Sequence, residues 1–400
     1  AAPSNLGRLQ VHTLTGTGNI LLDIPTTDDT VVQEVAENYL LDLDTPQFET
    51  LITVESGAVS ADGWTLNGES EDGSGFRQAV TNGTDTVAHA IYDYGLGVRN
   101  TDDDADADSL GVELDLTQVD IVKDQTLTFS TNGTLSAQVT NSSGAGNLSV
   151  TSGAEVTLSG KNNYSGNTNV VDKGSKLTAG ESGLGNTNTL DLASGTAFVN
   201  AGLNTVKSLT ASDATIELNK TFTLASGVAD RSTITGGSIS GVGTLAIKNG
   251  WLTVSGELND EKFSGIVDLG NVNPTVGYGG ATLVLDGLAG IGHGTINFTT
   301  ATSALDVNGS VGTTLTNLVS GAGEINVDLG VSTNVFDFRS DQGDAFKGWL
   351  ILNNAGYHLY DDAGELASAT LLTSGGGYVT VNTANYIADH KVGGLSLYGG

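Results

Sequence analysis

The chain of 400 residues contains no cysteine, no methionine and only 4 prolines. The absence of cysteine excludes disulfides and thiolate metal sites, so packing and backbone hydrogen bonds must stabilise the fold. Basic residues are scarce, because 15 Lys and Arg stand against 46 Asp and Glu for a net charge of -31. This balance argues against a nucleic-acid partner. No apolar run approaches the roughly 18 residues that a membrane-spanning helix needs.

Glycine, by contrast, is abundant, and many of the 56 glycines lie in repeated phrases. SGAGNLSVTSGAEVTLSG begins at Ser143, SGVGTLAIKNGWLTVSG at Ser240 and SGAGEINVDLG at Ser320. Each phrase is followed by an aromatic residue, one further residue and a glycine, in Tyr164-Ser165-Gly166, Phe263-Ser264-Gly265 and Phe346-Lys347-Gly348. We interpret the phrases as structural repeats in which glycines form corners and the strands between them pack inward.

A shorter repeat lies inside the longer one. Phrases that combine a turn with a strand recur at Gly153, Gly174, Gly195 and Asp213, about twenty residues apart, and each carries alternating apolar residues. This pattern predicts an all-β protein that forms a right-handed parallel three-stranded β-helix, or β-solenoid, because such turns bury a continuous core only by stacking. A β-sandwich or a membrane barrel fits the period less well. At about twenty residues each, roughly fourteen to seventeen turns would fit the chain.

The first 110 residues depart from this period. We expect residues 1–110 to start or cap the β-helix and to include a loop or hairpin excursion at about 68–111, with the regular β-helix at 111–400. A mobile acidic loop is the alternative for the excursion. A short helix is also expected here, because four apolar or aromatic residues follow Thr and Asp capping candidates at helical spacing: Val31, Val32, Val35 and Tyr39.

The stretch AEVTLSGKNNYSGNTNVVDKGSKLTAG, residues 154–180, resembles the passenger-associated repeat of bacterial autotransporters. That repeat has a Leu-x-Leu-x-Gly strand, an Asn-rich turn, Tyr-x-Gly, a strand of Thr and Val, and Gly-x-Leu-x-x-Gly. Phe263-Ser264-Gly265 and Phe346-Lys347-Gly348 look like degenerate copies, so the resemblance covers about residues 110–400. The chain thus resembles the passenger of an AIDA-type autotransporter adhesin of type V secretion, the group that includes Upa-type adhesins.

The resemblance implies a function and a location. We expect a cell-surface adhesin on the extracellular side of a bacterial outer membrane, secreted through a signal peptide and exported by its own translocation barrel, which this sequence does not include. The start at Ala1-Ala2-Pro3 fits a mature chain from which a signal peptide has been removed. The expected partners are host extracellular matrix proteins or glycosaminoglycans, and the expected role is colonisation or biofilm formation.

The distribution of charge suggests where such a partner would bind. Residues 161–262 contain 8 of the 15 basic residues, whereas residues 1–120 contain 3 basic and 23 acidic residues. Because a hundred residues form about five stacked turns, these bases could line part of one face and bind an anionic ligand. The alternative is that they only improve solubility. The candidate ligand-binding residues are Lys161, Lys173, Lys176, Lys207, Lys220, Arg231, Lys248 and Lys262.

Metal binding and catalysis receive weaker support. Asp104, Asp106 and Asp108 have the spacing of a calcium loop, with Asp115 at the twelfth position, but Ser109 replaces the glycine such a loop requires. A solvated acidic run is therefore the preferred interpretation, and no metal or other cofactor is expected.

A catalytic site is the remaining alternative. The segment NVFDFRSDQGD predicts inward Phe336 and Phe338, with Asp337, Arg339 and Asp341 outward on one face. Such a trio is more often a salt-bridge ladder than a catalytic group. We therefore expect no enzyme activity. Two other functions stay open: a self-associating protein that aggregates neighbouring cells, and a β-helical polysaccharide lyase or hydrolase.

Overall fold

The computed structural model describes residues 8–21, 34–43, 46–66, 73–100, 107–225, 231–270, 280–288, 290–338, 345–359, 366–381 and 392–397. Strands make up 61% of the chain, and the parallel sheets form a β-solenoid of about 11 turns. The predicted all-β class, a parallel three-stranded β-helix with an N-terminal excursion, is confirmed. The turns are fewer than expected because they vary in length, with register partners 18 residues apart at Ala197 and Thr215 but 31 apart at Trp251 and Thr282.

The chain divides into two compact units, residues 1–149 with 156–165 and residues 150–155 with 166–400. The first unit contains one 3-10 helix, η1 (Glu37–Leu40), among its described residues. Its strands, of which the last two extend beyond its limits, are β1 (Leu9–Val11), β2 (Gly18–Ile20), β3 (Val35–Ala36), β4 (Gln47–Val54), β5 (Trp64–Leu66), β6 (Gly73–Asn82), β7 (Asp85–Arg99), β8 (Ser109–Ile121), β9 (Thr126–Phe129), β10 (Gly133–Leu135), β11 (Gln138–Thr140), β12 (Asn147–Val150) and β13 (Glu155–Leu158).

A mixed sheet of order β1-β4-β8-β7-β6-β3 organises the first unit. Strands β6 and β7 form an antiparallel hairpin within the segment expected to leave the solenoid. The long strand β8 pairs antiparallel with β4 and β7, and its end pairs parallel with β11, where Gln118 lies opposite Gln138. Strand β8 therefore leads the chain from the excursion into the first solenoid turn.

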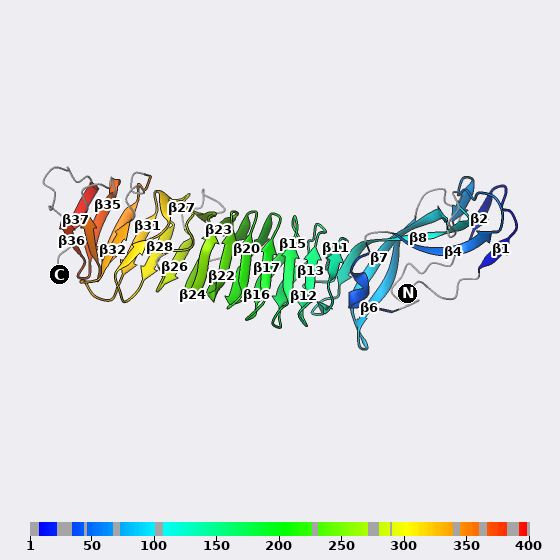
Figure 1. Cartoon of the computed structure of the whole chain (residues 1–400), viewed down its shortest axis with the longest axis horizontal. Helices are drawn as coiled ribbons and strands as arrows, with labels where there is room; N and C mark the ends of the chain where they lie inside the picture. Colours follow the sequence, from blue (N-terminus) through cyan, green and yellow to red (C-terminus); the bar gives the residue numbers. More distant parts are fainter. Residues whose placement is uncertain are drawn as a thin grey trace. The chain divides into compact units, whose positions relative to one another are not determined.

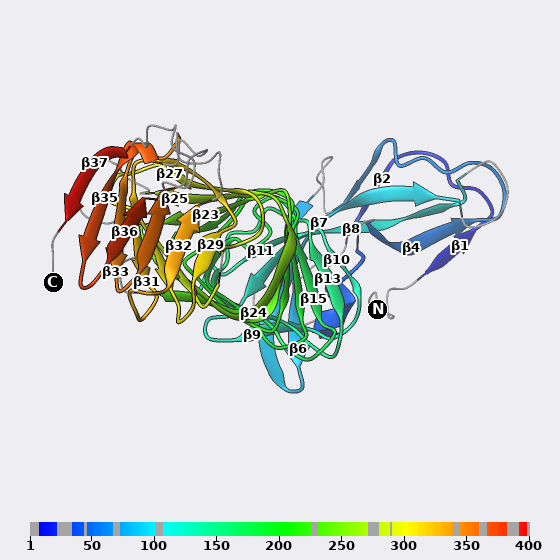
Figure 2. The ribbon, with the colours of Figure 1, turned by 60° about the vertical axis from the view of Figure 1, so that its left-hand side comes forward.

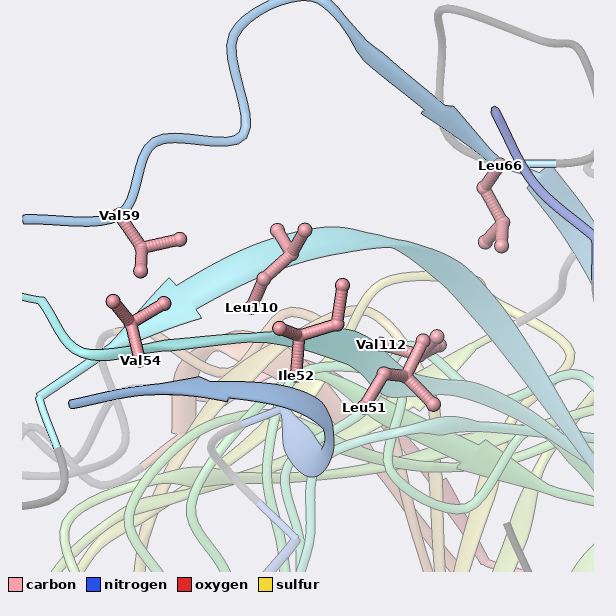
Figure 3. Packing of buried hydrophobic residues seen from close by; sticks show 7 residues of the cluster. All are labelled: Leu51, Ile52, Val54, Val59, Leu66, Leu110 and Val112. Carbon is pink, nitrogen blue, oxygen red and sulfur yellow. The ribbon is translucent and has the colours of Figure 1, made fainter. Parts of the chain in front are cut away.

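A small hydrophobic core stabilises the N-terminal strands of this unit. Half-buried Trp64 and Tyr94 pack against it. Figure 2 shows β1, β2 and β4 gathered beside β8. The buried side chains of the core, drawn in Figure 3, are Leu51, Ile52, Val54, Val59, Leu66, Leu110 and Val112.

Helix η1 covers the open edge of the first solenoid strands. Side-chain oxygens of Glu37 and Asn38 accept the backbone N–H groups of Thr128 and Ser130 at 2.7 and 2.9 Å. Asp42, just after η1, accepts the N–H of Thr134 on β10 at 2.9 Å. An exposed strand edge invites pairing with other chains, so these side chains replace the missing neighbouring strand.

The predicted N-terminal helix is only partly found. Val31 and Val32 lie outside the described residues, and Val35 belongs to β3. The described segment after Val35 contains the single 3-10 turn of η1, which includes Tyr39. The side chains of Glu37 and Asn38 in this turn bond the backbone at the end of β9.

The second unit consists of stacked strands (Figure 1). In chain order they are β14 (Ser165–Val170), β15 (Lys176–Ala179), β16 (Asn186–Leu192), β17 (Ala197–Asn200), β18 (Asn204–Val206), β19 (Ser208–Ser212), β20 (Thr215–Leu218), β21 (Phe222–Leu224), β22 (Arg231–Gly241), β23 (Thr244–Lys248), β24 (Trp251–Phe263), β25 (Ile266–Gly270), β26 (Thr282–Asp286), β27 (Thr295–Phe298), β28 (Ala304–Asn308), β29 (Thr313–Leu315), β30 (Leu318–Gly321), β31 (Glu324–Asp328), β32 (Val335–Phe338), β33 (Trp349–Asn353), β34 (Gly356–Leu359), β35 (Leu366–Ser374), β36 (Tyr378–Val381) and β37 (Val392–Leu397).

These strands form three parallel faces. Face 1 contains β16, β19, the first halves of β22 and β24, and β26, β28, β31, β33, β35 and β37. Face 2 contains β15, β17, β20, the second halves of β22 and β24, and the sheet β29-β32-β34-β36. Face 3 is the sheet β18-β21-β23-β25-β27-β30. A turn such as β19, β20 and β21 visits the three faces in that order.

The interior of the second unit is apolar and contains pairs of tilted aromatic rings. The ring centroids of Phe198 and Phe222 are 5.4 Å apart, and those of Phe298 and Phe346 are 5.8 Å apart. Phe263 and Phe346, the aromatic residues of two repeated phrases, are fully buried. These aromatic residues therefore supply core contacts.

The glycines of the repeated phrases have two separate roles. Gly241 and Gly321 take left-handed backbone conformations, with φ of 101° and 90°, which glycine adopts without strain. Gly265 instead lies where a Cβ atom would be 1.9 Å from the carbonyl oxygen of Gly243 in the preceding turn, and Gly348 meets Gly323 in the same way. The second role is a close approach of backbone between turns, which only glycine permits.

Candidate functional site

The structure places the eight candidate bases at strand ends and in the turns between strands. Lys161 follows β13 in the first unit and is exposed. The seven others belong to the second unit. Lys173 lies between β14 and β15, Lys176 on β15, Lys207 between β18 and β19, Lys220 between β20 and β21, Arg231 at the start of β22, Lys248 at the end of β23 and Lys262 near the end of β24.

Three of these bases contact other side chains. Lys248 on face 3 lies 2.6 Å from Asp268 of the next turn, and both side chains are about one-fifth exposed, at 20% and 21%. Lys176 lies 3.5 Å from Glu155 in a solvent-exposed pair. The guanidinium of Arg231 lies 4.7 Å from the ring centroid of Trp251. These cations are therefore partly neutralised or covered within the fold.

Four exposed lysines in the second unit, within its described part, form no ion pair: Lys173, Lys207, Lys220 and Lys262. Lys220 follows a face 2 strand and Lys262 lies near the end of one, whereas Lys207 precedes a face 1 strand. The candidate bases are thus divided among several turns and faces, with four of them in the second unit, and Lys161 in the first, free to meet an anionic ligand.

The predicted calcium loop is only partly visible. Asp104 and Asp106 lie outside the described residues. Asp108 directly precedes β8, and Asp115 on β8 lies opposite Asp93 on β7. Over the described ranges, no group of three or more His, Asp or Glu residues could hold a metal ion.

The catalytic candidates are likewise incompletely described. Phe336 is fully buried, as expected, and Asp337 follows it on β32 with its side chain half-buried. Arg339 and Asp341 lie outside the described residues.

A groove in the first unit is a feature that the sequence did not reveal. The groove has a volume of about 270 Å³ and is lined by Pro46, by residues 93–96 of β7, and by Glu113 and Asp115 of β8. Arg99 links two of the lining residues, because its Nη2 donates to the carbonyl oxygen of Pro46 at 2.7 Å and its Nε lies 3.7 Å from Glu113. The acidic lining arises from the antiparallel register of β7 and β8, which places acidic residues on opposite strands side by side.

Comparisons with known proteins give no match for the chain among protein families, curated proteins or solved structures. In the parts of the chain that the structure describes, no helix has the length and apolar character to span a membrane.

Proposed function

We propose that the protein is the passenger of a cell-surface autotransporter adhesin, exposed on the extracellular side of a bacterial outer membrane. The β-solenoid fold is compatible with this function. The resemblance of residues 154–180 to the passenger-associated repeat supports the same class. In this proposal the protein is not an enzyme and uses no cofactor.

The expected ligand is an anionic matrix component, such as a glycosaminoglycan or an acidic region of a matrix protein. The observation that carries this part is the group of four exposed lysines without ion pairs, Lys173, Lys207, Lys220 and Lys262, in a chain with few bases. Contacts of this kind are weak singly but add when one long polymer touches several turns. Binding should weaken with salt, because screening acts over about 10 Å at 0.1 M ionic strength.

The test is binding of the full chain to heparin, hyaluronan and matrix proteins at low and high salt. A variant with Lys173, Lys207, Lys220 and Lys262 changed to Gln should lose salt-sensitive binding. The matched control changes four exposed residues further along the chain to Asp, and therefore alters net charge equally: Thr302, Ser310, Thr314 and Thr333. The proposal fails if neither wild type nor control binds, or if both variants bind as wild type does.

Self-association is a second candidate, favoured by the uneven charge. Residues 263–400 carry 3 basic and 12 acidic residues, whereas residues 161–262 are nearly balanced, with 8 basic and 9 acidic. A lysine-bearing segment of one molecule could therefore meet the acidic segment of another. Sedimentation velocity at low and high salt tests this idea, and a monomer at every concentration and salt level counts against it.

A further inference from the structure

Face 1 carries an outward surface formed by β28, β31 and β33, which we call the Trp349 surface. The second and fourth residues of each strand are fully buried, so the first, third and fifth residues point outward. The register places Trp349 beside Glu324 in one row and Asn353 beside Asp328 in another. Asp306 lies beside Asn326 in the middle row.

Trp349 is the large exposed apolar side chain of this surface, on which the outward Ala304 and Ile351 are half-buried. Its side chain is 47% exposed, although most large apolar side chains of the solenoid are buried. Its register neighbours in the two adjacent turns, Glu324 and Thr370, are polar. A large aromatic ring left in water on a flat sheet is available as a stacking platform.

Polar groups that can bind hydroxyls lie on the same face, in the middle row and in the far row, which is four residues or about 13 Å along the strands from Trp349. Over the part of the chain that the structure describes, the side chains of Asn308 and Asn353 form no hydrogen bonds. Asp328 accepts the N–H of Gly330 at 2.9 Å and keeps further acceptor capacity. Asn326 donates to Asp306 at 2.9 Å, which holds the middle row in place. The surface therefore offers amide donors, carboxylate or amide acceptors and an aromatic ring on one face.

The charge of the surface limits the ligand. Its outward positions include three acidic residues, Asp306, Glu324 and Asp328, and no Lys or Arg. Burial raises the pKa of Asp306, which the hydrogen bond from Asn326 opposes. A sulfated or carboxylated polymer would be repelled by these carboxylates, whereas a neutral ligand rich in hydroxyls would not.

We propose that the Trp349 surface binds a neutral polysaccharide, with the apolar face of one sugar ring stacked on Trp349 and hydroxyls bonded to Asn308, Asp328 and Asn353. Pyranose rings have an apolar face and a rim of hydroxyls, which match the ring and the polar rows. Trp349 and Asn353 lie at opposite ends of β33, about 13 Å apart at about 3.3 Å per residue, so a saccharide of about three sugars that lies along the strands can reach both. This site and its ligand are independent of the lysines in the proposed function.

The test measures binding of the full chain to immobilised neutral oligosaccharides of glucose, mannose, galactose, xylose and N-acetylglucosamine. Heparin is the anionic comparison. Trp349→Ala should weaken binding of the preferred glycan about tenfold or more, the effect of losing an aromatic hot spot. Trp349→Tyr should keep most of the binding, because it retains an aromatic platform. Asn353→Ala should give an intermediate loss.

A matched control is Leu318→Ala, which removes an apolar side chain of similar exposure, 44%, from face 3. It should bind as wild type does, and all variants should keep the wild-type melting temperature because the changed residues lie on the surface. The proposal is overturned if no neutral glycan binds, if Trp349→Ala binds as well as wild type, or if heparin competes for this surface. Since the lysine variant of the proposed function retains Trp349, failure of one proposal is distinguishable from failure of the other.

Discussion

Replacement of Asp120 by alanine should destabilise the first unit by about 3–5 kcal/mol, as expected for breaking a buried ion pair. The carboxylate is 5% exposed. It accepts the backbone N–H of Ser142 at 2.6 Å and the hydroxyls of Ser142 and Thr140 at 2.5 and 3.1 Å. Arg77 of β6 lies 3.4 Å away. Asp120 therefore connects the β6–β7 hairpin with the first turn of the solenoid.

The magnitude follows from the groups that would lose a partner. A hydrogen bond to a charged group contributes about 1.5–3 kcal/mol, and a donor left buried without a partner costs about 1–3 kcal/mol. These contributions are not additive among neighbours. Ser142 is exposed and Arg77 is half-buried, so water can replace part of the lost bonding. The expected total is accordingly much smaller than the sum of four separate contacts.

The assay is denaturant unfolding in a background with Trp251→Phe and Trp349→Phe, so that Trp64 alone reports on the first unit. Glu55→Ala is the comparison, because Glu55 lies in the same unit and accepts a bond from Gln10 at 3.1 Å but is exposed. Glu55→Ala should have the smaller effect. A loss below about 1 kcal/mol for Asp120→Ala, the scale of an average substitution, would refute the reasoning.

The effect of Asp120 should also depend on pH. Burial alone would raise the pKa of Asp120, but bonds from Ser142 and Thr140 and the charge of Arg77 outweigh it and lower the pKa. A lowered pKa in the folded state stabilises the fold above the unfolded value of about 3.9. This stabilisation is lost as the pH falls through the folded pKa, so the difference between wild type and Asp120→Asn should shrink in acid.

Two further predictions concern stability. Burial raises the pKa of Glu37, although the hydrogen bond from Thr128 opposes this shift. Wild type should therefore lose stability relative to Glu37→Gln as the pH rises above about 4.3. Urea unfolding at pH 4 and pH 7 measures the difference in stability between the two proteins, and a difference that does not change with pH contradicts the prediction. Gly265→Ala should lower the free energy of unfolding by about 3 kcal/mol or more, because the added Cβ would collide with the Gly243 carbonyl. Thermal unfolding measures this loss. The control is Gly309→Ala, where the atom nearest to an added Cβ is a side-chain atom at 3.3 Å.

The solenoid could be predicted because its turns repeat the same local chemistry. Val156 and Leu158, or Ile216 and Leu218, alternate with polar residues at a spacing near twenty, and all four are buried as expected. Corner glycines and strand alternation are local signals. They specify a parallel stack without any knowledge of the exact partner of each strand.

The N-terminal region could not be predicted in the same way, because its pairings are distant in sequence. Phe48 on β4 lies opposite Glu113 on β8, and Val35 on β3 lies opposite Val80 on β6. The helical spacing around Val35 was a local signal that these distant pairings outweighed. A single sequence contains no comparable signal for the register of β4 with β8.

The Trp349 surface on face 1 could not be predicted from the sequence either. Turns differ in length, so the face on which a residue lies depends on every insertion that precedes it. Trp251 and Trp349 occupy the same row of face 1, linked through the register of β24, β26, β28, β31 and β33. No regular period joins these two positions, and the exposure of Trp349 becomes visible only in the structure.

The neighbours of an outward side chain on a solenoid are the residues one turn before and one turn after it. Lys248 accordingly meets Asp268, and Lys176 meets Glu155, each about one turn away in sequence. Counting charges along a segment therefore overstates the cations available to a ligand, because partners in adjacent turns neutralise some of them. The same rule sets polar, apolar and acidic residues into rows across the strands. A ligand that repeats along its own length can use such rows, which is why polymers are the ligands we propose for both surfaces.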